Sequence, residues 1–186
     1  MQNQKHVIMQ TIFNNKYRIS TTRAKWHNYQ NGAYFVTICT KNRIHYFGEI
    51  VDGKMVLSDI GIIANQCIMD TNKHFPDANV PVYVIMPDHI HAIITINSQD
   101  NDRDAKFCAS TTKQKFGPQS KNLASIIRGI KIGVTKYARN NDIPFEWQRL
   151  YYDSIIQDTN DMKRITKYIN DNVKKWDNDN HSNRMS

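Results

Sequence analysis

Two histidines, His89 and His91, interrupt the otherwise apolar stretch "YVIMPDHIHAIITI" at residues 83–96. The β-branched residues around them predict a strand over residues 89–96. Because side chains alternate between the two faces of a strand, both imidazoles point to one face, and the other face receives Ile90, Ala92, Ile94 and Ile96. Two neighbouring imidazoles on one face can bind a single metal ion. The alternative is a pair of ordinary hydrogen-bonded histidines, and the spacing alone leaves both open.

The elements that would position this pair alternate between strands and helices. The Asp52-Gly53 pair between two short alternating runs predicts a hairpin. Aromatic and β-branched runs predict strands over residues 33–40, 80–86, 89–96 and 145–158. Apolar residues at helical spacing predict helices over residues 59–74, 121–139 and 159–176, with Ser58 and Thr159 as N-caps of the first and last.

Without the hairpin and the last helix, the order is strand, helix, strand, strand, helix, strand. This is the ferredoxin-like βαββαβ plan, an α+β fold with one antiparallel sheet and helices on one face. The extra hairpin and the C-terminal helix are additions to it. We expect the other face of the sheet to be free to hold a substrate, with both histidines on that face.

One domain accounts for most of the 186 residues. We expect an N-terminal extension over residues 1–30, the domain over 31–176 and a polar tail over 177–186. Residues 97–120 are polar, lack periodicity and predict a long loop. No apolar run is long enough to span a membrane and the start lacks a signal-peptide core, so we expect a cytoplasmic, nucleoid-associated protein. The spacing of Cys39, Cys67 and Cys108 favours buried free thiols over a disulfide or a zinc site.

The chain is strongly basic. Its 25 Lys and Arg against 17 Asp and Glu give a formal net charge of +8. This balance favours a polyanionic partner such as nucleic acid, although a merely solvated basic surface would have the same composition. The candidate phosphate-binding residues are Arg43, Lys113, Lys115, Lys121, Arg128, Lys131, Lys136 and Arg139.

Four stretches of the chain carry a resemblance to a known family. They are "NGAYFVTICTKNRIHYFGEI", "VIMPDHIHAIITI", "SIIRGIKIGVTKYA" and "WQRLYYDSIIQDTNDMKRITKYINDNVKKW". The stretches occur in the expected order, and the resemblance covers roughly residues 17–176. The sequence resembles the single-tyrosine HUH nucleases, specifically the IS200-like transposases and the REP-associated tyrosine transposases, and more closely the second group.

The resemblance implies roles for particular residues. The family's metal motif of histidine, bulky apolar residue and histidine matches His89, Ile90 and His91. Its nucleophile lies in a pattern similar to Tyr-Ile-x-x-Asn-Pro, which matches Tyr168 as nucleophile and Asn172 as third metal ligand. This chain has Val173 where the family usually has proline, so the helix can continue towards residue 176. The other tyrosines weighed as nucleophiles are Tyr137, Tyr151 and Tyr152.

The activity that this resemblance implies is nicking and rejoining of single-stranded or hairpin DNA through a 5′-phosphotyrosine intermediate, with Mg²⁺ or Mn²⁺ and no nucleotide cofactor. The protein would act as a monomer or a homodimer. Two alternatives of other classes remain at this point. One is a catalytically silent protein that binds DNA hairpins, and the other is an RNA-binding module with an open sheet.

Overall fold

The computed structural model describes residues 12–13, 16–17, 29–97 and 122–176. A four-stranded sheet has the spatial order β6-β7-β3-β8, and all neighbouring strands are antiparallel. Two shorter pairs, β1 with β2 and β4 with β5, lie outside it. The strand bounds are β1 Ile12–Phe13, β2 Lys16–Tyr17, β3 Asn31–Cys39, β4 Gly48–Val51, β5 Lys54–Leu57, β6 Ala78–Ile85, β7 His89–Asn97 and β8 Tyr152–Ile156.

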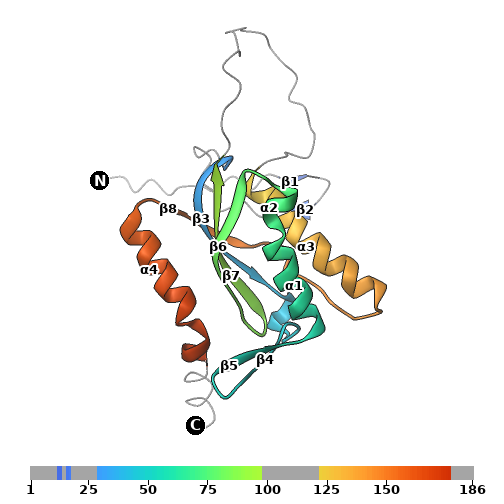
Figure 1. The fold of residues 1–186 in the computed structure, drawn as a ribbon. Coiled ribbons are helices and arrows are strands. Elements are labelled where there is room, and N and C mark those ends of the chain that lie inside the picture. Colours follow the sequence, from blue (N-terminus) through green and yellow to red (C-terminus); the bar gives the residue numbers. More distant parts are fainter. Residues whose placement is uncertain (1–11, 14–15, 18–28, 98–121, 177–186) are drawn as a thin grey trace, which may run out of the picture.

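The chain order of the main sheet and its helices is β3, α1, β6, β7, α3, β8, which confirms the predicted ferredoxin-like plan (Figure 1). The helices α1 (Asp59–Met69) and α3 (Leu123–Asn140) pack together on one face of the sheet, with the short α2 (Thr71–His74) after α1. We call this face the α1/α3 face. The large hydrophobic core lies between it and these helices.

Local sequence explains where these elements begin and turn. The Ser58 hydroxyl accepts a hydrogen bond from the backbone nitrogen of Gly61, so the predicted N-cap of α1 is confirmed. The predicted hairpin is formed by β4 and β5. Asp52 and Gly53 at its turn both have positive φ angles, 49° and 68°, which Asp and Gly tolerate better than most residues.

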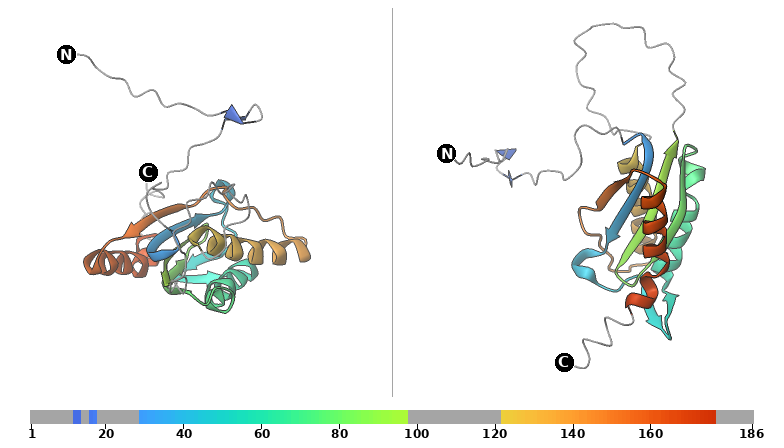
Figure 2. Two further views of the ribbon diagram at one scale, coloured as in Figure 1. Left: turned by 90° about the horizontal axis from the view of Figure 1, so that it is seen from above. Right: turned by 90° about the vertical axis from the view of Figure 1, so that its left-hand side faces the viewer.

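We had expected the opposite face of the sheet to be free. This expectation is wrong, because α4 (Thr159–Asn170) covers that face. Figure 1 shows the sheet between α4 on one side and α1 and α3 on the other, and Figure 2 shows the same layers from two further directions. The physical reason is the apolar stripe of α4. Ile165 and Ile169 need a partner, and they pack against Ile93 and Ile156 of the sheet. We call this side the α4 face.

Two boundaries also differ from the prediction. The N-cap of α4 is Asp158 rather than Thr159, because the Asp158 carboxylate accepts hydrogen bonds from the backbone nitrogens of Asn160 and Asp161. The last strand is shorter than the predicted 145–158, since only Tyr152–Ile156 pairs with β3. Before it, Trp147 makes a single bridge to Thr40.

The predicted N-terminal extension, long loop and polar tail lie largely outside the described residues. Cys39 is buried and Cys67 is partly buried, both as free thiols, and Cys108 lies outside the described residues. Within the part of the chain that the structure describes, no helix is long and apolar enough to cross a membrane.

Candidate active site

The two histidines lie side by side on the α4 face, as the alternation of β7 predicts. Both are buried, with 5% of His89 and 6% of His91 exposed. Their Nε2 atoms are 3.1 Å apart and their rings are nearly perpendicular, at 75°. The two imidazoles therefore direct the same ring atom to one point.

Neighbouring side chains hold each imidazole through its other nitrogen. The Asp88 carboxylate lies 2.5 Å from Nδ1 of His89, and its second oxygen accepts a hydrogen bond from Nε of Arg43 at 2.8 Å. On β3, the Thr37 hydroxyl lies 2.8 Å from Nδ1 of His91. An ionised carboxylate can only accept, so Nδ1 of His89 carries a proton, and in the neutral imidazole the lone pair is then on Nε2.

Sequence reasoning missed Asp88, Thr37 and the role of Arg43 here. Asp88 precedes His89 directly, and nothing in the residue pattern marks it as the partner of that imidazole. Thr37 is the cross-strand partner of His91, and this pairing follows from the register between β3 and β7 rather than from any motif.

The environment keeps His91 neutral. Burial lowers the pKa of His91 from 6.5 to about 3, the neighbouring His89 and Arg43 act in the same direction, and Asp88 opposes them. A neutral imidazole retains a lone pair, which is the form that binds a metal ion or accepts a proton. At neutral pH His91 is therefore available for either task.

Tyr168 of α4 faces this pair. Its hydroxyl oxygen lies 3.3 Å from Nε2 of His91, and the edge of its ring meets Phe35 with the centroids 5.9 Å apart. Tyr168 is 40% exposed, so it remains open to solvent while its hydroxyl contacts His91.

A cavity of about 520 Å³ adjoins this tyrosine, and we call it the tyrosine cavity. Three cationic side chains of the α4 region line it, Arg164, Lys167 and Lys175, and the Lys175 ammonium lies 5.3 Å from the centre of the Tyr168 ring. The complete lining is Phe35, Ser154, Arg164, Ile165, Lys167, Tyr168, Asp171 and Lys175.

Asn172 is buried, with 7% exposed, just beyond the end of α4. It follows Tyr168 by four residues and precedes Trp176 by four, and the Trp176 ring lies 5.8 Å from the His89 ring. The chain turns at Asp171, and residues 172–176 then continue as a helical turn. In the sequence, Asn172 thus lies midway between Tyr168, which contacts His91, and Trp176, which contacts His89.

The ligand chemistry available here is limited. Within the described residues, no three His, Cys, Asp or Glu side chains are grouped so that they could hold a metal ion. A third protein ligand beside the two imidazoles would therefore come from another residue type, and Asn172 is a buried amide four residues after Tyr168.

The other candidate tyrosines do not meet the histidines. Tyr137 and Tyr151 pack against the large core on the α1/α3 face. Tyr152 lies on the α4 face and is 63% exposed, but it is the strand partner of Thr37 and so lies two strands away from His91. The structure brings Tyr168 alone of these four to the pair.

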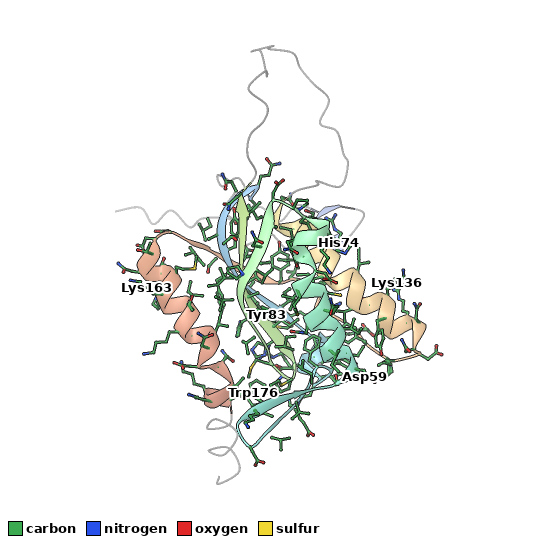
Figure 3. All side chains as sticks on the ribbon, viewed as in Figure 1. Asp59, His74, Tyr83, Lys136, Lys163 and Trp176 are labelled. Carbon is green, nitrogen blue, oxygen red and sulfur yellow. The ribbon has the colours of Figure 1, made fainter. Side chains whose placement is uncertain are left out.

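The candidate phosphate-binding residues are dispersed. Lys113, Lys115 and Lys121 lie outside the described residues. Arg128, Lys136 and Arg139 are exposed on α3, across the sheet from Tyr168. Figure 3 shows Lys136 of α3 and Lys163 of α4 on opposite sides of the molecule.

The other two basic candidates already have protein partners. Arg43 pairs with Asp88. Lys131 donates a hydrogen bond to the backbone oxygen of Gln148 at 2.8 Å and lies over the Trp147 ring, and burial lowers its pKa below the ordinary value.

Comparisons with known proteins bear on this site. No protein-family model matches the sequence. The chain is 38% identical over 162 residues to a Haemophilus influenzae protein described only as uncharacterized, across 84% of this chain and 89% of that protein. A solved structure of a REP-associated tyrosine transposase bound to a REP hairpin is similar with a TM-score of 0.57 at 19% identity, covering 84% of this chain and 74% of that chain. The two share the fold.

Proposed function

This chain belongs to the same family as the Haemophilus influenzae protein, and we propose that it is a transposase-like endonuclease and strand transferase that nicks and rejoins single-stranded or hairpin DNA. The observation that carries this proposal is the position of the Tyr168 hydroxyl, 3.3 Å from Nε2 of a buried, neutral His91 beside His89. A nucleophile, a pair of nitrogen ligands and a cationic cavity meet at this point. The shared fold with a transposase that was solved with a REP hairpin supports DNA as the substrate.

The two histidines fit a bound cation. When both Nδ1 atoms carry protons, the Nε2 lone pairs face each other at 3.1 Å, and this repulsion is relieved by a cation between them. In this proposal His89, His91 and Asn172 hold Mg²⁺ or Mn²⁺, whose chemistry there is to withdraw charge from the scissile phosphate. Asp88 and Thr37 keep the two Nε2 atoms directed to the site.

The chain's own residues then carry the bond exchange. Tyr168 gives up its proton to solvent, its oxygen forms a bond to phosphorus while the bond from phosphorus to the 3′ oxygen breaks, and the departing 3′ oxygen takes up a proton from solvent. The products are a 5′-phosphotyrosine and a free 3′-hydroxyl. The new ester retains the energy of the broken bond, so attack by a 3′-hydroxyl can rejoin the strand without a nucleotide cofactor. Lys167 and Lys175 beside Tyr168 are positioned to bind phosphates of the strand.

The test is formation of a covalent protein–DNA adduct on hairpin oligonucleotides taken from the sequences that flank the gene. We expect an adduct with Mn²⁺ or Mg²⁺, no adduct after chelation, and none with Tyr168→Phe. The Lys163→Ala variant is a matched control from the same helix, because Lys163 is exposed and lies outside the tyrosine cavity.

Other outcomes would point elsewhere. An adduct formed by Tyr168→Phe would assign the nucleophile to another tyrosine, with Tyr152 or Tyr151 next. Saturating binding of DNA hairpins without any adduct would identify a silent binding protein instead. Stronger binding of RNA than of DNA, again without an adduct, would identify an RNA-binding module.

A further inference from the structure

A second cavity lies on the α1/α3 face, between α3 and residues 149–153, and we call it the basic groove. Its volume is about 710 Å³. Five cationic side chains line it against one carboxylate: Arg128, Lys131, Lys136, Arg139, Arg149 and the carboxylate of Asp153. Such an excess of one charge in a concave site attracts an anionic ligand.

Most of these cations have no competing partner. Lys131 is engaged with Gln148 and Trp147. Arg128, Lys136, Arg139 and Arg149 make no ion pair with any other residue that the structure describes. An ion-paired cation would have to break its ion pair before it bound a phosphate. These four cations have no such pair to break among the described residues.

The basic groove also exposes apolar side chains among its cations. Ile132 is 58% exposed and Leu150 is 52% exposed, and both line the groove together with Tyr151. Cations bind phosphates, whereas apolar and aromatic surfaces contact the faces of bases. A duplex keeps its base faces stacked inside, so this combination fits unpaired nucleotides better than a double helix.

The basic groove and the tyrosine cavity lie on opposite faces of the sheet and meet at one edge. Tyr151 and Asp153 line the basic groove, and Ser154 of the same strand lines the tyrosine cavity. Among the described residues β8 pairs only with β3, so it lies at the end of the strand order. Tyr152 lies between these residues, is 63% exposed and points to the α4 face. A strand that leaves the basic groove can therefore pass around the β8 edge to reach Tyr168.

We propose that the basic groove binds unpaired nucleotides of the DNA whose continuation enters the tyrosine cavity around the β8 edge. The groove would position the strand and lengthen its footprint, while the chemistry remains at Tyr168. The inference rests on the proposed function for the identity of its ligand as DNA. Its binding step can nevertheless be measured without cleavage.

The test compares two double variants by fluorescence anisotropy with labelled single-stranded oligonucleotides, in chelator so that no cleavage occurs. Arg139→Ala with Arg149→Ala removes two cations from the basic groove. Lys54→Ala with Lys163→Ala removes two exposed cations outside both cavities and is the charge-matched control. The probes are one oligonucleotide long enough to span both cavities, of about 30 nucleotides, and one of about six.

We expect the groove variant to bind the long probe about tenfold more weakly than wild type and to reduce the slope of log affinity against log salt by about 1.4, the value for two lost phosphate contacts on a single strand. The short probe can occupy only one cavity at a time, so its affinity for the groove variant should fall less than that of the long probe. The control should stay within about twofold of wild type on both probes. If the groove variant matches the control on the long probe, the inference is wrong.

Two further arms separate this inference from the proposed function. Duplex DNA and unlabelled single-stranded DNA are compared as competitors of the long probe. If the duplex competes equally well, the assignment of unpaired nucleotides to the groove is wrong. The covalent-adduct assay decides the proposed function separately. If the groove variant loses long-probe binding but wild type forms no adduct, the groove inference is supported and the nuclease proposal is wrong. If wild type forms an adduct but the groove variant binds normally, the nuclease proposal is supported and the groove inference is wrong.

Discussion

The two faces of the sheet are built from the same strands but serve different purposes. On the α1/α3 face, β3 and β7 contribute side chains to a continuous apolar core with Ile94 fully buried. On the α4 face, the alternate residues of the same strands include Thr37, His89 and His91, and only a small apolar cluster holds α4. The alternation of a β-strand thus lets one face provide the apolar core while the other carries the candidate active site.

The polar groups of the α4 face are costly to bury unless they are paired. Asp88 is 3% exposed and is held between His89 and Arg43. Among the described side chains, no buried nitrogen or oxygen lacks a hydrogen-bond partner. The difference between the faces predicts that truncating the apolar core of the α1/α3 face should mainly affect folding, whereas removing the paired polar groups of the α4 face should mainly affect function. Three predictions test this division, in order of decreasing effect.

The largest effect should follow truncation in the large core. Ile94→Ala removes a fully buried side chain and leaves a cavity, so we expect the free energy of unfolding to fall by about 2–5 kcal/mol. Ile62→Ala, at a residue of α1 that is 53% exposed, should change it by less than about 0.5 kcal/mol. Urea unfolding measures both. Where Ile94→Ala remains folded, its adduct yield should equal that of wild type, and a loss of adduct there would break the division.

Substitution of Asp88 should have a smaller effect, on metal affinity and adduct formation rather than on folding. Asp88→Ala removes the acceptor that holds His89, so we expect Mn²⁺ affinity and adduct rate to fall by about 10–100-fold, or about 1.4–2.8 kcal/mol. Asp88→Asn should recover part of the loss, because an amide oxygen still accepts from Nδ1. Calorimetric titration with Mn²⁺ measures the affinity.

The control for this prediction is Glu146→Gln, which breaks an exposed ion pair with Lys41 and should leave Mn²⁺ affinity unchanged. Equal losses in Asp88→Ala and Asp88→Asn would show that the charge of the carboxylate, rather than its position as an acceptor, is what His89 requires.

The smallest effect concerns pH. The pKa of His91 is lowered from 6.5 to about 3 in the folded protein. Between these pH values His91 is protonated in the unfolded chain but neutral in the folded chain. The contribution of His91 to stability is therefore complete above pH 6.5 and is lost as the pH falls towards about 3. Between about pH 7.5 and pH 5.5 we expect a loss of about 1 kcal/mol.

Urea unfolding in chelator at these two pH values checks this expectation. His91→Gln should flatten the pH dependence, whereas His74→Gln, at an exposed residue of α2, should keep the wild-type dependence. A His91→Gln variant with the same acid sensitivity as wild type would assign that sensitivity to other groups.

Much of this architecture is predictable from local patterns. The ferredoxin-like order, the hairpin at Asp52-Gly53 and the Ser58 cap follow from residue periodicity and turn chemistry, and the structure confirms them. The placement of His89 and His91 on one face follows from the period of a strand. The predicted length of the last strand was wrong because pairing with β3, rather than residue type, decides where β8 begins.

The sequence by itself therefore determined which side chains share a face, because the repeat of a strand or helix is a local property of the backbone. Only the tertiary structure decided that α4 covers the histidine face, that Arg43 and Asp88 hold His89, and that Thr37 meets His91. Thr37 and His91 are far apart in the chain, and their contact depends on sheet order and register. Those are set by the packing of the whole domain, and no local motif encodes them.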